Sequence, residues 1–214
     1  MKTKLTLVVL FSVVAIALNA QNAPYYFGLK AAPSICWLKP DADNWSGDGA
    51  KTGFSWGFIA EKNFTENYSI ASGFNMLFNG GKLSIKEDVV NTNRNYFLKY
   101  IEVPVTLKMR TNPIGGIRYF GRVGLGTAFN IGSKIIDETT PQGGATTTTK
   151  KINYDKISLV RESIIIGLGG EFELNEGPRL GAELTFNNGF TNIITEKNHK
   201  AMPNFFELAF SVLF

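Results

Sequence analysis

Apolar and polar residues alternate at every second position over much of this chain, and the last eleven residues, Asn204 to Phe214, show the pattern most fully. Residues that alternate in this way lie on opposite faces of an extended strand. Glu207, Ala209 and Ser211 are among the residues of one face. The other face is continuously apolar and ends on an aromatic residue; its members are Phe206, Leu208, Phe210, Val212 and Phe214.

The same alternation predicts eight strands after residue 20. The chain is rich in glycine (22 residues) and phenylalanine (17 residues) and shows no long helical period, which together predict an almost entirely β structure. The expected strands are Tyr25–Leu38, Thr52–Phe64, Tyr68–Asn79, Phe97–Arg110, Ile117–Gly132, Leu159–Leu174, Arg179–Asn187 and Asn204–Phe214.

The connections between these strands alternate in length, and the short ones are rich in turn residues. The short turns are Thr65–Asn67, Thr111–Gly116 and Asn175–Pro178, and the long polar connections are Lys39–Lys51, Gly80–Tyr96, Ser133–Ser158 and Asn188–Pro203. Short turns on one rim and long loops on the other are typical of a transmembrane barrel with both termini in the periplasm. We therefore predict an all-β, eight-stranded, antiparallel up-and-down transmembrane barrel, whose closure leaves no unpaired strand edge in hydrocarbon.

Charge decides which side of each strand faces lipid. In the expected fifth strand, Val123 and Leu125 lie on one side, and Arg118 and Arg122 lie on the other. Turning this strand over would place two arginines against acyl chains, at about 2–4 kcal/mol each near the midplane. The apolar side is therefore expected to face lipid.

Applied to all eight strands, this rule sends seven cations and six anions into the barrel. They are Lys30, Glu61, Glu102, Lys108, Arg110, Arg118, Arg122, Arg161, Glu171, Glu173, Arg179, Glu183 and Glu207. An eight-stranded barrel is only wide enough for side chains to fill its interior. We expect a nearly neutral network of ion pairs and hydrogen bonds that fills the lumen, rather than an open pore.

Three charges take the outward side, namely Lys62, Lys99 and Glu162. Each lies toward a strand end, where the burial penalty falls to about 0–1 kcal/mol and a long side chain reaches the interface. Pro104 is on the inward side of the expected fourth strand. Because proline cannot donate a ladder hydrogen bond, we expect a β-bulge there.

The amino-terminal segment has the layout of a cleaved export signal. Lys2 and Lys4 precede an apolar stretch from Leu5 to Leu18, which is too short to span a bilayer comfortably. We expect cleavage after Ala20, so that residues 1–20 form the signal and residues 21–214 form the barrel domain. Loss of the two lysines lowers the formal net charge from +4 to +2, which gives a nucleic-acid partner little support.

Catalytic, cofactor and metal sites have little support in the sequence. The single histidine, His199, lies in a hydrophilic stretch with no oriented partner. The single cysteine, Cys36, is expected to face inward as a small filler. One histidine and one cysteine do not assemble a transition-metal site. We predict no enzymatic activity, no cofactor and no metal.

Four segments carry a resemblance to a known family. They are Phe27–Ala31, Tyr100–Val105, Gly121–Gly126 and Asn187–Asn192, of which the Ile101–Pro104 element is the most specific. The mature chain resembles the Gram-negative outer-membrane β-barrel family that includes the PorT-like, or porin family, proteins. The resemblance implies an eight-stranded barrel in the outer membrane and, for PorT itself, a part in protein export through a dedicated secretion apparatus.

Three functions remain open at this point. The first is an interaction barrel in protein secretion or envelope assembly. The second is a narrow channel for small solutes, which a crowded lumen disfavours. The third is a soluble periplasmic ligand-binding barrel, which needs apolar residues to point inward. The expected partners are outer-membrane lipid and lipopolysaccharide, the barrel-assembly machinery through the closing strand, and secretion-apparatus proteins.

Overall fold

The computed structural model of the protein describes residues 25–41, 44–87, 90–152, 156–174, 177–195 and 200–214. The expected export signal, residues 1–20, and His199 lie outside these ranges. The strands are β1 (Tyr25–Pro40), β2 (Trp45–Gly47), β3 (Lys51–Asn63), β4 (Tyr68–Glu87), β5 (Val90–Arg110), β6 (Ile117–Pro141), β7 (Thr147–Ile152), β8 (Val160–Glu173), β9 (Arg179–Gly189) and β10 (Ala201–Leu213).

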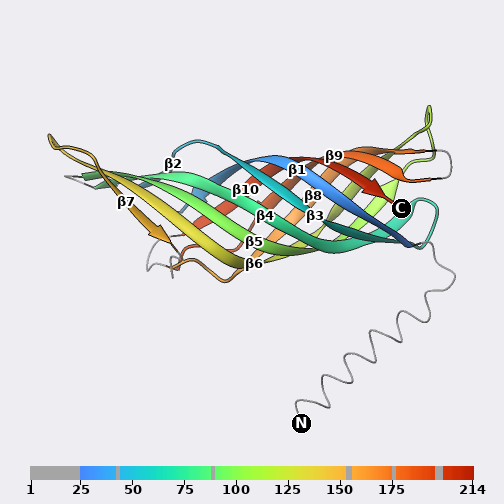
Figure 1. The fold of residues 1–214 in the computed structure, drawn as a ribbon, viewed down its shortest axis with the longest axis horizontal. Coiled ribbons are helices and arrows are strands. Elements are labelled where there is room, and N and C mark those ends of the chain that lie inside the picture. Colours follow the sequence, from blue (N-terminus) through green and yellow to red (C-terminus); the bar gives the residue numbers. More distant parts are fainter. Residues whose placement is uncertain (1–24, 42–43, 88–89, 153–155, 175–176, 196–199) are drawn as a thin grey trace, which may run out of the picture.

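Eight of these strands form a closed antiparallel ring. Going around it, the order is β1, β3, β4, β5, β6, β8, β9 and β10, and β10 pairs again with β1. The strands are strongly tilted around a long barrel (Figure 1). The predicted fold, an eight-stranded antiparallel up-and-down barrel, is confirmed. Within the described ranges, no helix is long and apolar enough to cross a membrane.

The two rims of the barrel differ as the connection lengths predict. We call the rim with the short turns after β3, β5 and β8 the turn end, and the opposite rim the loop end. In the turn between β5 and β6, Gly115 and Gly116 have φ values of 60° and 82°, a conformation that favours glycine. Strand β1 begins at the turn end, and β10 finishes there. At this rim the backbone N–H of Phe27 donates a hydrogen bond to the carbonyl of Phe214.

Two of the expected long loops are largely strand, so this part of the sequence prediction was wrong. The stretch expected as the loop Gly80–Tyr96 continues β4 and β5 as a ladder that runs from Gly80↔Phe97 to Glu87↔Val90. β6 continues to Pro141 beside β5, and β7 pairs with β6. We call residues 80–87, 90–96 and 133–141, together with β2 and β7, the blade. It extends beyond the other strands at the loop end, where Figure 1 labels β2 and β7.

The ladder between β5 and β6 contains one bulge, and it is not at Pro104. The register shifts between Lys99, which pairs with Gly132, and Tyr100, which pairs with Asn130, so that Ile131 is the extra residue. An extra residue reverses which side chains face inward. On the turn-end side of the bulge the even-numbered Ala128 is buried, and on the loop-end side the odd-numbered Ile135 is buried. Pro104 instead stays in register opposite Gly126, so the expected bulge at the proline was wrong.

Candidate functional site: the barrel interior and the blade

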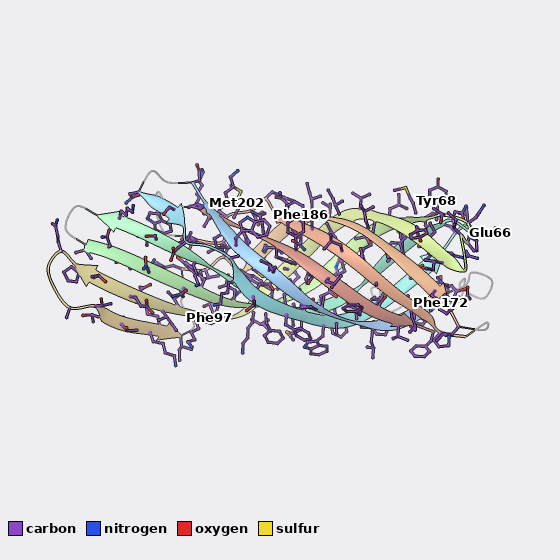
Figure 2. All side chains as sticks on the ribbon, turned by 90° about the horizontal axis from the view of Figure 1, so that it is seen from above. Glu66, Tyr68, Phe97, Phe172, Phe186 and Met202 are labelled. Atoms are coloured by element: carbon purple, nitrogen blue, oxygen red, sulfur yellow. The ribbon has the colours of Figure 1, made fainter. Side chains whose placement is uncertain are left out.

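The outer wall of the barrel is apolar, as the alternation predicts. Val103, Val105, Val123 and Leu125 are exposed at the middle of the wall, and side chains project from the barrel all around it (Figure 2). Of the closing-strand residues, Phe206, Leu208, Phe210 and Phe214 are exposed and Val212 is half-buried, whereas Glu207 and Ala209 are buried. An apolar outer face of this extent is unfavourable in water and suits hydrocarbon.

Five of the expected inward charges meet near the turn end, from four different strands. Both Glu61 of β3 and Glu171 of β8 form ion pairs with Lys108 and Arg110 of β5. Arg179 of β9 lies 3.8 Å from both carboxylates. β5 is not a neighbour of β3 or β8 in the ring, so the ion pairs of Lys108 and Arg110 cross the barrel interior. Arg179 and Glu171, in contrast, lie on the neighbouring strands β9 and β8. We call this group of three cations and two anions the turn-end charge cluster.

Cation–π contacts support the turn-end charge cluster from both sides. The guanidinium of Arg179 lies 3.4 Å from the ring centroid of Tyr26, and the ammonium of Lys108 lies 4.1 Å from that of Phe120. An aromatic ring face attracts a cation, and more strongly where water is excluded. These rings therefore offset part of the excess positive charge.

Two more ion pairs lie farther from the turn end. Arg122 makes two contacts with Glu183, at 2.9 Å and 2.8 Å, across the intervening strand β8. Gly167 of β8 makes room for this pair, because a Cβ there would collide with a carboxylate oxygen of Glu183. Lys30 lies 3.3 Å from Glu207.

Glu102 is the centre of a hydrogen-bond network at the middle of the barrel. Its carboxylate accepts from Asn75 at 3.2 Å and from Asn187 at 3.0 Å, and Arg161 lies 3.5 Å away. The guanidinium of Arg161 also lies 5.2 Å from the ring centroid of Phe205. The cavity at this level, which Glu102 helps to line, has a volume of about 10 Å³. That is room for roughly one water molecule.

Arg118 and Glu173 are placed differently from the other eleven expected inward charges. Arg118 is half-buried and Glu173 is exposed, and neither takes part in the ion pairs found among the described residues. Together with Glu171 and Arg179 they line a pocket of about 140 Å³ at the turn end. These two side chains lie where the interior opens toward solvent.

Lys62 and Glu162 lie on the outer wall near strand ends, as expected, whereas Lys99 lies in the middle of β5, because this strand continues to Val90. Lys62 lies 5.3 Å from the ring centroid of Tyr25 at the turn end, and Lys99 lies 5.9 Å from that of Phe78 toward the loop end. Glu162 accepts a hydrogen bond of 2.9 Å from Thr127. Tyr68 and Phe172 are exposed on the outer wall toward the turn end (Figure 2).

Toward the loop end the interior is apolar, which the sequence analysis missed. We call this cluster the loop-end core; its members are Cys36, Leu38, Trp45, Leu77, Leu83, Ile85, Tyr96, Leu98, Tyr100, Ala128, Ile135, Ile193, Ile194, Ala201 and Phe205. Leu98 and Tyr100 lie on the inward side of β5, as Glu102 does. The alternation of β5, followed from Glu102 toward the loop end, was the signal that could have predicted their inward position. Cys36 is buried as expected, and its sulfur lies 3.5 Å from the hydroxyl of Ser34.

The connection between β9 and β10 closes the loop-end core. Ile193 and Ile194 are fully or almost fully buried, and Asn192 holds this segment in place. Its side-chain oxygen accepts from the backbone N–H of Ile194 at 3.1 Å and of Ala201 at 2.8 Å. The loop end is therefore covered by residues of the chain itself.

A salt bridge fixes the strands of the blade. Arg94 of β5 donates two hydrogen bonds to Asp137 of β6, at 2.7 Å and 3.1 Å. Burial lowers the pKa of the Arg94 guanidinium, but the interactions with Asp137 and Tyr96 together outweigh burial and raise this pKa above its usual value. A bidentate pair of this kind is geometrically specific. It holds β5 and β6 together above the rim.

The model of one protein family matches residues 19–195, which is most of the chain. This family is described as the outer membrane protein beta-barrel domain. The chain belongs to this family. Members of the family are outer-membrane proteins, which agrees with the apolar outer wall. A search of curated proteins finds no match.

Solved structures of bacterial surface and outer-membrane proteins are similar to this chain. Neisserial surface protein A is 13% identical with a TM-score of 0.53, covering 90% of this chain and 98% of that chain. OprG from Pseudomonas aeruginosa is 11% identical with a TM-score of 0.44, covering 90% and 97%. Ail of Yersinia pestis is 12% identical with a TM-score of 0.42, covering 88% and 98%. The likeness to neisserial surface protein A shows a shared fold and nothing more.

Proposed function

We propose that this outer-membrane barrel is a closed interaction scaffold whose blade binds an extended segment of a partner protein. The observation that carries the proposal is the position of β7. Among the described strands, β7 pairs with β6 only, and all six of its residues are exposed. A strand with one free edge can accept a further strand through main-chain hydrogen bonds.

The filling of the interior favours a scaffold over a channel. The turn-end charge cluster, the network around Glu102 and the loop-end core follow one another along the barrel axis. A passage for solutes would have to open all three. The apolar side chains of the wall point outward rather than into the barrel, which supports a membrane barrel over a soluble ligand-binding barrel.

The proposal includes an orientation and a class of partner. With both mature termini in the periplasm after signal cleavage, the turn end faces the periplasm and the blade stands outside the cell. The partner is then a secreted or envelope protein, and the Ile101–Pro104 element supports a PorT-like role in secretion. The closing strand β10, with Phe214 at its end, is the segment that the barrel-assembly machinery would recognise. Catalysis has no part in this proposal.

Photo-crosslinking in living cells tests the blade directly. A photoreactive residue at Thr147 in β7 is expected to form a specific adduct with one protein, whereas the same residue at Leu125, in the lipid-facing wall, forms none. Thr149→Pro removes a main-chain donor from the edge strand and should abolish the adduct, while Thr149→Ala should keep it. Equal adducts at both sites, or an adduct that survives the proline, would count against the scaffold.

Two further measurements separate the scaffold from its alternatives. Refolded protein in a planar bilayer is expected to show no steady conductance, and a steady conductance would establish a channel instead. Deletion of the gene followed by assay of exported proteins tests the secretion role. Normal export would remove that role and leave the interaction with another envelope protein as the remaining form of the proposal.

A further inference from the structure

A groove on the outer wall gathers lysines where the blade joins the barrel. It has a volume of about 800 Å³ and is lined by residues of β3, β4, β5, β6 and β7. Four of the lining residues are lysines, and the lining contains no aspartate or glutamate. The lysines are Lys51, Lys99, Lys134 and Lys150. This is a concentrated positive charge without an acidic partner in the groove.

Two of these lysines converge on one aromatic ring. The ammonium of Lys51 lies 2.8 Å from the ring centroid of Phe97, and the ammonium of Lys134 lies 4.9 Å from the same centroid. Phe97 lies near the junction of blade and barrel (Figure 2). The ring and the carbonyl of Tyr96, which accepts from Lys51 at 2.9 Å, compensate only part of the repulsion between two like charges.

The backbone is shaped to bring the lysines together. The bulge at Ile131 reverses the facing of β6, so that Lys134 points outward, on the same side as Lys99. Lys51 reaches Phe97 by crossing β4 at Gly80. A Cβ at Gly80 would lie 3.3 Å from Cδ of Lys51. A side chain at this position would therefore crowd the lysine.

Apolar side chains form the largest part of the remaining lining. Six residues are apolar (Phe54, Phe78, Phe97, Leu98, Ile131 and Ile152), and the others are Thr52, Gly53, Asn79, Gly132 and Ser133. Phe54, Phe78 and Ile131 are exposed there, and Ile152 of β7, which is also exposed, lines the groove as well. A ligand that fits such a surface has an anionic group for the lysines and a hydrocarbon part for the aromatic and aliphatic side chains. Ammonium groups bind phosphate through charge-assisted hydrogen bonds.

We propose that this groove binds the phosphate group of an acylated, phosphorylated lipid of the outer leaflet, with an acyl chain lying against the wall. The lysines stand just above the apolar wall, at the level expected for lipid headgroups if the loop end faces outward, as the proposed function has it. Binding at this site would fix the junction between blade and barrel relative to the membrane surface.

Native mass spectrometry of the refolded protein in a neutral detergent tests the site without depending on cellular orientation or on a protein partner. The probes are diphosphorylated lipid A, the same lipid without phosphates, and inorganic phosphate. We expect one diphosphorylated lipid A per barrel. We also expect binding of the phosphate-free lipid to be weaker by about tenfold or more, and inorganic phosphate to bind weakly.

The variant Lys51→Gln/Lys134→Gln should weaken binding of the diphosphorylated lipid by about tenfold or more. The control Lys39→Gln/Lys200→Gln removes the same charge from exposed lysines near β1 and β10 and should bind like the unchanged protein. Heat-modifiable migration on a gel establishes that each variant is folded. If the double variant does not fold, the single variant Lys99→Gln provides the same test.

Four results would overturn the proposal. They are unchanged binding by a folded groove variant, an equal loss in the control variant, equal binding of the phosphate-free lipid, and equally tight binding of inorganic phosphate. The third would show apolar association only, and the fourth would show an anion pocket rather than a lipid site. None of them bears on the free edge of β7, which the crosslinking experiment tests separately.

Discussion

The two ends of the barrel interior are filled in different ways, although both lie on the inward side of the same strands. At the turn end, Lys108 and Arg110 of β5 meet carboxylates from across the barrel. At the loop end of the same strand, Leu98 and Tyr100 pack in an apolar core. Alternation therefore determines which residues face inward, but not what chemistry fills the interior.

The difference follows from what covers each end. The turns at the turn end are too short to fold over the opening, and the pocket there reaches Glu173, which is exposed. The charges of the turn-end charge cluster are buried, and their ion pairs with one another offset the hydration that they lose. The loop end is covered by Ile193 and Ile194, so apolar side chains there are shielded from water and packing alone stabilises them.

The largest effect is expected from removing a carboxylate of the turn-end charge cluster. In Glu171→Gln, Glu61 is the only remaining anion beside three cations. Breaking a buried ion pair lowers the free energy of unfolding by about 3–5 kcal/mol. Glu173→Gln, two residues along the same strand, changes the same charge at an exposed position and should cost little. Urea unfolding from lipid vesicles, followed by tryptophan fluorescence, measures both. Equal losses would show that the cluster does not stabilise the barrel.

A cavity in the loop-end core should have the next largest effect. Leu77 is 1% exposed, and Leu77→Ala is expected to lower the free energy of unfolding by about 2–5 kcal/mol. Leu159 is 66% exposed in the loop before β8, so Leu159→Ala serves as the control with a small expected effect. The same unfolding experiment compares the two. A loss at Leu77 no larger than at Leu159 would mean that the loop-end interior is not packed.

The smallest effect is expected when an ion pair is replaced as a whole. Arg122→Met with Glu183→Leu removes both charges, and such replacements leave stability within about 1 kcal/mol or increase it. Glu183→Gln alone should lower the free energy of unfolding more than the double variant, because Arg122 then keeps its charge without its partner. Urea unfolding of both variants provides the measurement. A double variant that is as unstable as Glu183→Gln, or less stable, would contradict this.

The sequence predicted the wall of the barrel better than its ends. All eight ring strands were found, because one apolar face per strand is a strong period-two signal. The blade was predicted as loop because its strands carry polar residues such as Lys82, Asn91 and Asn93. These residues interrupt the apolar alternation, as is usual for strands exposed to water. Blade residues Leu83 and Ile85 still alternate, and they pack in the loop-end core.

The sequence could not predict which charged side chains form ion pairs across the lumen. The inward sides of Glu61 and Glu171 followed from alternation, but their shared contacts with Lys108 and Arg110 depend on how far each strand is displaced along the barrel. The bulge at Ile131 also had no decisive local signal, and Pro104 was the wrong place to expect one. A proline that stays in register shows that a missing donor is not sufficient to make a bulge.

Spin-label accessibility along β10 is the most direct test of a barrel that is filled inside and lipid-facing outside. Nitroxide labels would be placed singly at Leu208, Ala209, Phe210 and Ser211 in a Cys36→Ser background, with the protein refolded in lipid vesicles. We expect high accessibility to oxygen at Leu208 and Phe210, and low accessibility to both oxygen and a water-soluble nickel complex at Ala209 and Ser211. Ready access of the nickel complex to Ala209 would mean an open aqueous pore, and shielding of Leu208 and Phe210 from oxygen would mean that this face does not meet lipid.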